Sequence, residues 1–413
     1  MNNRTSRFVS IGSLILVVVG ILLGILERTN LIQLGNGVVY AELFARTWIV
    51  VLIILAAPLV ASFLLVSLLT LMKTKKTGKL ALRGLGIHVG LLILAAIVSV
   101  GLSSILLQAA REEMQLFVPT VTNANYLTWL TESLGLTQAK VARLIIPIIL
   151  FTVITAALLY RFPDKTKTFV TDKAAFVSNK LFALLSYLFM ALPISAGCLA
   201  LVITVSNGAM LVEVAGFYVF GVCGVIVFFI GVVYGAVYFF GHTTVKNFAR
   251  AMLPAQLVAA STCSSLATLP ALLLSVKQSG ISDEVAGSTV PLFVSFFRIN
   301  LMVANPFSFF LLSRLYDLPI EGPNLLLFLS LMMLTSFGSP GLPQTGNVYS
   351  LPVFLAAGIP LEGVVLLKAL DAIPDVFKTV LNVTETGAVT SIMMRWPSYG
   401  SQQKTPTESL RQV

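Results

Sequence analysis

The sequence predicts an all-α polytopic membrane protein, and three observations support this fold class. Of the 413 residues, 57% are hydrophobic and only 11% are charged, and the mean hydropathy is +0.94. A soluble domain carries about 25% charged residues. Apolar runs recur that approach the ~20 residues of a membrane helix, whereas the short alternating strands of membrane barrels do not recur. The run at 8–26 lacks a small-residue cleavage site, so we expect a first span there and no signal peptide.

Six spans are expected in the N-terminal part, at roughly 8–27, 47–72, 84–108, 141–161, 181–205 and 214–241. Lys and Arg residues collect before the first span and after the second, fourth and sixth. This alternation follows the positive-inside rule and places the N-terminus in the cytoplasm. We therefore attribute the net charge of +10 to membrane topology and not to nucleic-acid binding. An external polar connection is predicted at 115–139, and a cytoplasmic basic linker at 162–180.

Two interrupted apolar segments alternate with two polar spans in the C-terminal part. The segment 253–276 is broken by the polar run Ser261–Ser265, and the segment 324–354 by three glycines and two prolines within 338–346. We predict two re-entrant hairpins; for the first segment the alternative is one helix whose hydroxyls bond its own carbonyls. The span between them, 290–312, is expected to break at Pro306. Paired interrupted segments indicate a secondary-transporter binding site near mid-membrane.

The last span carries a stripe of polar residues between 371 and 390. Helical spacing would place these residues along one face: Asp371, Asp375, Lys378, Thr379, Asn382 and Thr386. An ionisable side chain at membrane depth costs at least ~2.5 kcal/mol and indicates a functional site. The stripe combines carboxylates, an ammonium group and neutral hydrogen-bonding side chains. One alternative is a solvated juxtamembrane helix. The other is that Asp375 and Lys378 only pair with each other and bind no ligand.

Three motifs resemble the dicarboxylate/amino acid:cation symporter family, also called the sodium:dicarboxylate symporter family. They are Ser261–Pro270 (STCSSLATLP), Gly338–Gly341 (GSPG) and Asp371–Asn382 (DAIPDVFKTVLN). The resemblance is strong over about 245–395 and rests on the layout of spans before that. It implies a homotrimer of an elevator-type transporter, with eight transmembrane helices and two re-entrant helical hairpins in each chain.

The resemblance also implies a division of the chain. Residues 1–245 would form mainly scaffold and trimerisation spans, with spans three and six partly in the transport domain. Residues 246–395 would form the transport core, with hairpin one at about 250–278, span seven at 288–314, hairpin two at 323–357 and span eight at 361–393. Residues 396–413 would be a cytoplasmic tail.

Carried over residue by residue, the resemblance implies a substrate pocket between the hairpin tips and span eight. Asp375 would bind an α-amino group, Asn382 an α-carboxylate, and Lys378 takes the position of an arginine that holds an acidic side chain. The other substrate-binding residues implied are Ser264, Ser265, Ser339, Gly341 and Thr379. Lysine cannot make the two-pronged contact of arginine, which leaves a neutral amino acid or another small carboxylate open.

The cation sites depart from the family pattern. Span seven of sodium-coupled relatives carries Asn-Met-Asp-Gly-Thr, where this chain has Phe297–Leu301 (FRINL), and Thr386 stands in the place of an aspartate. We therefore expect coupling to protons in place of sodium. A residual sodium site near Asn382 and Thr386 stays open, and no other metal site is expected, because His88 and His242 are the only histidines.

Within Phe297–Leu301, the stretch that replaces the sodium-binding motif of span seven, one residue is an arginine, Arg298. We predict that Arg298 lies near Asp371 or Asp375 and takes the charge role of a bound cation; the alternative is an arginine that snorkels from a span end. The coupled proton would sit on Asp371, Asp375 or Glu385, since membrane carboxylates are common proton relays. The coupling residues predicted in this way are Asp371, Asp375, Arg298, Glu385 and Asn382.

These inferences predict a secondary active symporter that moves an acidic amino acid or a small dicarboxylate with a cation, H+ or Na+. The expected partners are this substrate, membrane lipid and two further copies of the chain, without a cofactor. The location would be the plasma or inner membrane, with both termini cytoplasmic. The alternative is a substrate-gated ion channel or a non-transporting sensor on the same scaffold. An enzyme is not expected, because the sequence lacks a zinc-protease motif, a nucleophile elbow and a phosphate loop.

Overall fold

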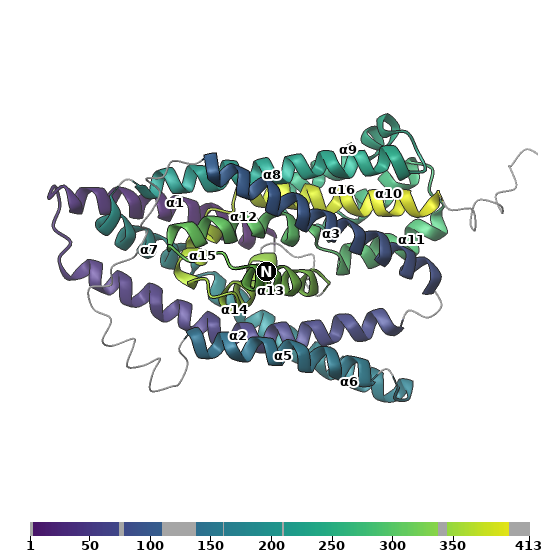
Figure 1. The fold of residues 1–413 in the computed structure, drawn as a ribbon, viewed down its shortest axis with the longest axis horizontal. Coiled ribbons are helices and arrows are strands. Elements are labelled where there is room, and N and C mark those ends of the chain that lie inside the picture. Colours follow the sequence, from purple (N-terminus) through teal and green to yellow (C-terminus); the bar gives the residue numbers. More distant parts are fainter. Residues whose placement is uncertain are drawn as a thin grey trace, which may run out of the picture.

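The computed structural model describes residues 3–73, 78–109, 138–159, 161–208, 210–337 and 345–395. These residues form helices and no strands, which confirms the all-α prediction (Figure 1). The helices are α1 Asn3–Arg28, α2 Asn36–Lys73, α3 Gly78–Ala109, α5 Gln138–Leu159, α6 Asp164–Phe189, α7 Leu192–Asn207, α8 Met210–Phe240, α9 Val245–Thr262, α10 Leu269–Gln278, α11 Asp283–Phe296, α12 Ile299–Leu315, α13 Gly322–Ser336, α14 Thr345–Ala356, α15 Leu361–Ala369 and α16 Pro374–Met394.

Four stretches of described residues are long and apolar enough to cross a membrane: Ile11–Arg28, Leu82–Gln108, Met210–Phe240 and Val285–Leu315. Large apolar side chains such as Ile15, Ile97 and Phe220 point outward from three of them. An outward apolar surface on long helices is typical of contact with lipid. The count of eight spans with two re-entrant hairpins stays a prediction.

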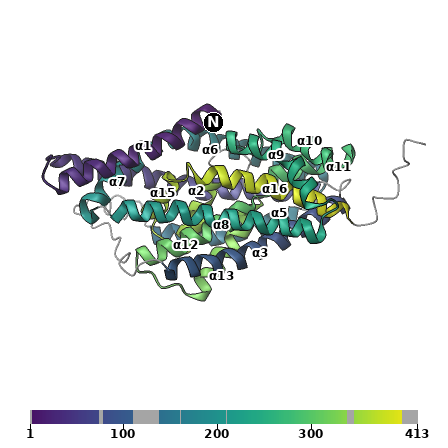
Figure 2. The ribbon, with the colours of Figure 1, turned by 90° about the horizontal axis from the view of Figure 1, so that it is seen from above.

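The helices pack into two groups. The first contains α1, α2, α5, α6 and α7, and the second contains α3, α8 to α12 and α16, with α13, α14 and α15 between them (Figures 1 and 2). The closest packing in the first group joins α1 to α7, where a Cβ on Gly20 would lie 2.2 Å from the Gly197 carbonyl oxygen. Small residues allow such close approach of membrane helices.

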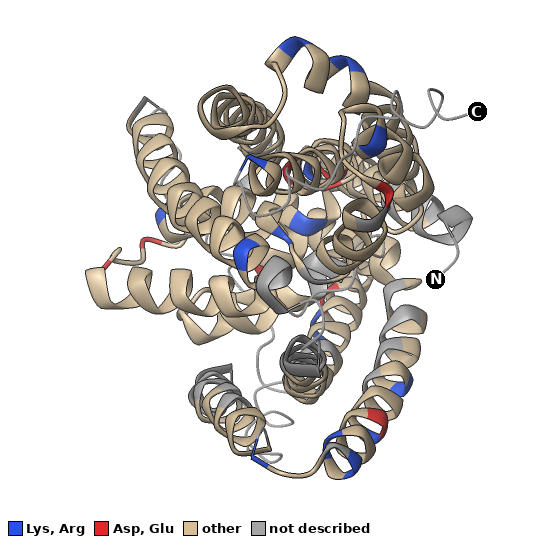
Figure 3. Ribbon diagram, turned by 90° about the vertical axis from the view of Figure 1, so that its right-hand side faces the viewer, with Lys and Arg blue, Asp and Glu red and all other residues tan. Residues whose placement is uncertain are grey.

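The core of the second group is polar as well as apolar. Along α12 every side chain except that of Arg314 is buried, and α16 is buried from Lys378 to Met393 apart from Val380. Figure 3 looks along the bundle and shows blue and red ribbon at its centre as well as at its edge. Charged groups therefore lie inside this group of helices, where they must be paired.

The predicted basic linker at 162–180 is mostly helical and belongs to α6, while its cytoplasmic location stays a prediction. Its lysines and phenylalanines repeat at helical spacing, with the Lys173 ammonium 5.6 Å from the Phe169 ring centroid and Lys180 5.7 Å from that of Phe176. Such contacts four residues apart stabilise a helix. The predicted external connection at 115–139 lies outside the described residues, apart from its last two positions.

Two predicted spans are interrupted elsewhere than expected. The fifth span, 181–205, is divided between α6 and α7 at Met190–Ala191, and Pro193 lies in the first turn of α7. The span at 290–312 continues through Pro306 inside α12 and breaks instead at Phe297–Arg298, where Phe297 is extended. The helix continues through Pro306, which removes one intrahelical hydrogen bond, and the residues around it on α12 are buried.

Candidate functional site

The polar stripe of the last span is not one helix. Asp371 lies in the turn 370–373 between α15 and α16, which corrects the prediction of a continuous helical face. Pro374 begins α16, a position at which proline loses no intrahelical bond. The Asp375 N–H donates to the Asp371 carbonyl at 2.8 Å and closes this turn where the chain changes direction. The turn brings Asp371 against the buried face of α8 and α12.

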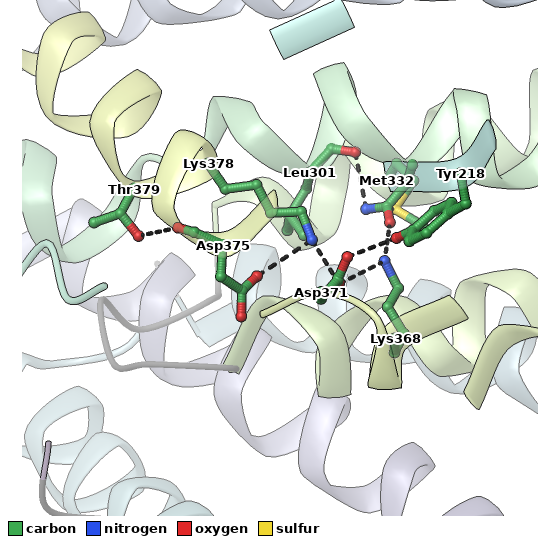
Figure 4. Close-up of polar contacts among 9 residues, drawn as sticks. Tyr218, Leu301, Met332, Lys368, Asp371, Asp375, Lys378 and Thr379 are labelled. Carbon is green, nitrogen blue, oxygen red and sulfur yellow. Dashed lines mark hydrogen bonds and ion pairs between the residues drawn. The ribbon is translucent and has the colours of Figure 1, made fainter. Parts of the chain in front are cut away.

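Two lysines and two aspartates meet at this turn and form what we call the Lys–Asp cluster: Lys368, Asp371, Asp375 and Lys378 (Figure 4). Lys378 Nζ lies 2.5 Å from Asp371 Oδ2 and 3.3 Å from Asp375 Oδ1. Lys368 Nζ lies 3.6 Å from Asp371 Oδ2. Two positive and two negative charges balance, which makes their burial tolerable.

Groups from α8 and α12 complete the cluster. Tyr218 OH on α8 donates to Asp371 Oδ1 at 2.6 Å, and Lys368 Nζ donates to Asn305 Oδ1 at 2.8 Å. Asn305 Nδ2 in turn donates to the Leu301 carbonyl at 2.9 Å (Figure 4). Sequence reasoning did not assign Tyr218, Asn305 or Lys368 to this site. The available signal for Lys368 was a single lysine within the apolar run before Asp371.

The two aspartates differ in exposure and in partners. The Asp371 side chain is 2% exposed and contacts three donors, whereas that of Asp375 is 15% exposed and contacts one lysine. Asp371 therefore holds the cluster together. Asp375, in the first turn of α16, is the more exposed of the two carboxylates, and Lys378 lies between them.

The remaining predicted residues of the last span have local partners. Thr379 Oγ1 donates to the Asp375 carbonyl at 2.8 Å, and Thr386 Oγ1 to the Asn382 carbonyl at 3.0 Å. Asn382 Oδ1 accepts a hydrogen bond from Asn300 N–H at 3.1 Å. That bond satisfies a backbone donor at the start of α12, which otherwise has no intrahelical partner. The Asn300 side-chain oxygen is buried without a hydrogen bond to the described residues.

The predicted hairpin residues are only partly described. Ser264 and Ser265 are buried in the turn between α9 and α10, two helices that pack on each other. Cys263 starts this turn with a positive φ of 50°, and Ser264 Oγ accepts a hydrogen bond from Ala267 N–H at 3.3 Å. Ser339 and Gly341 lie outside the described residues.

A second polar group lies farther along α16. His88 Nδ1 on α3 lies 2.7 Å from Glu385 Oε1, and both side chains are 0% exposed. We call these two residues the His–Glu pair. The His88 ring stacks on Phe297 with centroids 4.0 Å apart and 5° between planes, and Phe337 meets it edge-on. Sequence reasoning named Glu385 but gave His88 no role in the site.

Arg298 is buried, with 4% of its surface exposed, so it does not snorkel to a surface. Its Nη2 donates to the Val294 carbonyl at 2.8 Å, and the carboxylate whose charge acts on it is that of Glu385. We expected Asp371 or Asp375 as its neighbour. Those aspartates have Lys368 and Lys378 as their ion-pair partners instead.

Long apolar helices that enclose paired charges beside interrupted helices define an integral membrane protein with the internal site of a secondary transporter. The chain belongs to the sodium:dicarboxylate symporter family, whose model matches residues 10–396. The family resemblance seen in the motifs is thereby confirmed. Since this is a family of transporters, the prediction that the chain is not an enzyme is confirmed as well.

Individual relatives are similar at low identity. The "Proton/sodium-glutamate symport protein" of Bacillus subtilis is 24% identical over 180 residues, 44% of this chain and 42% of that protein. The "C4-dicarboxylate transport protein" of Brucella anthropi is 25% identical over 260 residues, 61% and 57% of the two chains. The "Proton/glutamate-aspartate symporter" of Escherichia coli is 26% identical over 171 residues, 41% and 39%. The aligned parts thus span about two fifths to three fifths of these relatives.

Proposed function

We propose that the protein is a cation-coupled symporter of an acidic amino acid. The observation that carries this proposal is the Lys–Asp cluster, in which a reachable Asp375 carboxylate and the Lys378 ammonium stand side by side in a buried, charge-balanced setting. The relatives' names, which include glutamate, aspartate and C4-dicarboxylates, support a small acidic substrate.

The cluster favours an amino acid over a plain dicarboxylate. A ligand ammonium can pair with Asp375, and this releases Lys378 to bind the ligand's side-chain carboxylate. A dicarboxylate would bring two negative charges to Asp375 and would have nothing to pair with it, and like charges at this distance repel strongly in a buried site. The ammonium group is therefore the expected determinant of selectivity.

The coupling ion proposed is the proton. Phe297 and Arg298 bring an apolar ring and a positive charge to the start of α12, and neither side chain can ligate sodium. We also propose that the protein works as a homotrimer by an elevator movement, with both termini in the cytoplasm, as the family resemblance implies. The positive-inside distribution of Lys and Arg supports the orientation.

The test is uptake of labelled glutamate, aspartate and succinate into proteoliposomes, with sodium and proton gradients imposed separately. Concentrative uptake of the amino acids under a proton gradient alone is expected, with uptake of succinate at least about tenfold weaker. Asp375→Asn should abolish amino-acid uptake while leaving the protein folded, because this carboxylate has only one partner among the described residues.

Asp317→Asn serves as a matched control, since Asp317 lies in the turn after α12 and outside the cluster. Strict dependence on sodium would contradict proton coupling. Uptake of succinate in preference to glutamate would contradict the assignment of Asp375. Absence of all three uptakes, with substrate-evoked currents in their place, would establish the channel alternative.

A further inference from the structure

The His–Glu pair is a buried titratable group that substrate recognition by the Lys–Asp cluster does not use. Its two side chains come from residues 297 positions apart in the chain, and a 2.7 Å contact joins them. His88 Nε2 and Glu385 Oε2 are buried without a hydrogen bond to the described residues. An apolar membrane core offers no general reason to keep such a pair, because burying polar atoms without partners is costly.

Charge balance distinguishes this pair from the Lys–Asp cluster. In that cluster two lysines match two aspartates. Around the pair, the charge of the Glu385 carboxylate acts on Arg298, and its Oε1 lies 2.7 Å from His88 Nδ1, so one carboxylate is shared by one guanidinium and one imidazole. Histidine is the side chain whose charge changes most readily near neutral pH. One added proton changes the local charge by one unit, which is the charge that one acidic amino acid brings to the Lys–Asp cluster.

Several ionisable groups on the helices packed around the pair have partners elsewhere, whereas Arg83 of α3 and Lys246 and Arg250 of α9 are further charged groups on these helices. Tyr218 of α8 bonds Asp371, Tyr234 of α8 bonds Gln256 of α9, Lys277 of α10 pairs with Asp283 of α11, and Arg395 after α16 bonds the Phe239 carbonyl. The charged group that faces the pair from the packed elements is Arg298, at the N-terminus of α12. Proton uptake at the pair is therefore sensed first by α12.

Two helices connect the pair to the Lys–Asp cluster. On α16, Lys378 and Glu385 are seven residues apart, which is two turns on the same face and about 10 Å of rise. On α12, Arg298 faces Glu385, Asn300 N–H bonds Asn382 on α16, and Asn305 accepts a hydrogen bond from the Lys368 ammonium. A change of charge at Glu385 that moves the start of α12 would thus reach both lysines.

We propose that the His–Glu pair is the proton-carrying site of the transport cycle, binding one proton with each substrate and releasing it on the other side of the membrane. The proton bonds to His88 or Glu385 and leaves as hydronium, so no other reactant is needed. This inference rests on the proposed symport function, which it deepens by naming the coupling site. Linkage requires the two effects to be equal. If a bound proton raises the affinity for substrate by some factor, bound substrate raises the affinity of the pair for the proton by the same factor.

A direct test observes His88 by nuclear magnetic resonance in lipid nanodiscs. Because the chain has two histidines, His242→Gln leaves His88 alone, and His242 is exposed between α8 and α9. We expect the 15N signals of the His88 ring to change reversibly between neutral and protonated forms as the pH is varied. Addition of glutamate should shift this transition, and Glu385→Gln should remove or displace it. A ring that keeps one protonation state throughout, with and without glutamate, would overturn the proposal.

Transport assays provide the second test. Glu385→Gln keeps the shape of the side chain but removes the negative charge that stabilises a proton on the pair, so exchange of internal for external glutamate should survive within several-fold. Net uptake driven by a proton gradient should fall at least tenfold. His242→Gln should match the wild-type protein in both assays. If Glu385→Gln and His88→Gln accumulate glutamate as the wild type does, the proposal is wrong even though symport is established.

The two proposals fail differently. If the wild-type protein neither exchanges nor accumulates an acidic amino acid, the proposed function fails, and the resonance experiment still decides whether the pair binds a proton. The melting temperature in detergent shows whether a variant is folded. If a variant of the pair does not fold, the resonance experiment on the His242→Gln protein decides the question in place of that variant's transport assay.

Discussion

The Lys–Asp cluster and the His–Glu pair both involve α16, where Lys378 and Glu385 lie two turns apart on one face, yet the two sites differ in composition and surroundings. The cluster carries four charged side chains and keeps Asp375 partly exposed. The pair carries one carboxylate, one imidazole and a neighbouring arginine, and it is shielded by the rings of Phe297 and Phe337. Under our proposals, the first site exchanges charge with a ligand and the second holds a proton away from water.

This difference shows how one helix can serve two kinds of ligand. A charged substrate needs permanent charges that it can replace, and lysine and aspartate supply them. A proton needs a group that can be neutral, in a place where a single charge has a large effect because the surroundings are apolar. Four substitutions test whether the two sites are separate in this way, and they follow in order of decreasing effect.

Asp371→Asn should have the largest effect. It leaves Lys368 and Lys378 with one carboxylate between them and removes the acceptor of Tyr218, so we expect a loss of about 3–5 kcal/mol of stability. Thermal unfolding in detergent measures it. Asp283→Asn is the control, because Asp283 is 82% exposed and its bridge to Lys277 should contribute less than about 1 kcal/mol. Equal shifts for both variants would show that Asp371 does not hold the cluster.

Lys378→Gln should weaken binding of glutamate by roughly 10–100-fold, or about 1.5–3 kcal/mol, because a charged hydrogen bond to the ligand is lost. Isothermal titration of the purified protein would measure this loss. Lys378→Arg should restore most of the affinity and favour acidic ligands further through its two-pronged contact. If Lys378→Gln binds glutamate as tightly as the wild type, Lys378 serves only its neighbouring aspartates.

Gly84→Ala tests how the rings beside the His–Glu pair are packed. A Cβ at Gly84 would lie 2.1 Å from the tip of the Phe293 ring, which stacks on Phe297 with centroids 4.8 Å apart. We expect a cost of about 1–3 kcal/mol in the melting experiment. Gly86→Ala on the same helix meets nothing within 4 Å and should be neutral or stabilising by up to about 1 kcal/mol. Similar losses for both alanines would mean that the ring stack does not depend on Gly84.

Phe297→Leu should have the smallest effect on stability, about 0.5–1.5 kcal/mol from the lost stacking on His88. Its effect on coupling should be larger than on substrate affinity, because water gains access to the pair and not to the Lys–Asp cluster. Measuring both proton-driven uptake and glutamate affinity separates an effect on coupling from an effect on substrate binding. Phe220→Leu on the outer face of α8, where the side chain is 82% exposed, is the control. Equal losses of uptake and affinity would argue against separate sites.

Much of the architecture followed from local patterns. Apolar runs predicted membrane helices, and the Ser/Thr-rich interruption at 261–265 predicted the turn between α9 and α10, whereas most of the glycine- and proline-rich interruption at 338–346 lies outside the described residues. Errors arose where neighbours override local preference. Pro306 does not end α12, where the residues around it are buried, and the charged segment 164–180 is helical because of its lysine–phenylalanine contacts.

The Lys–Asp cluster was predicted in part. Asp371, Asp375 and Lys378 were found because they lie within eight positions of one another in an apolar span. Lys368, Tyr218 and Asn305 were not assigned to it, although the first is only three residues from Asp371. Tyr218 is 153 residues away from Asp371, and no local pattern relates the two.

By itself, the sequence determined the membrane class, the helical fold, the family and the two charges proposed to meet the substrate. Each of these depends on composition or on spacing within one segment, and water and lipid act on such patterns directly. Only the tertiary structure decided which cation neutralises which carboxylate. His88 meets Glu385, and Lys378 and Lys368 meet Asp371, because helix packing brings these groups together. Inside a medium of low polarity, that choice of partner determines which group is left free to bind a proton.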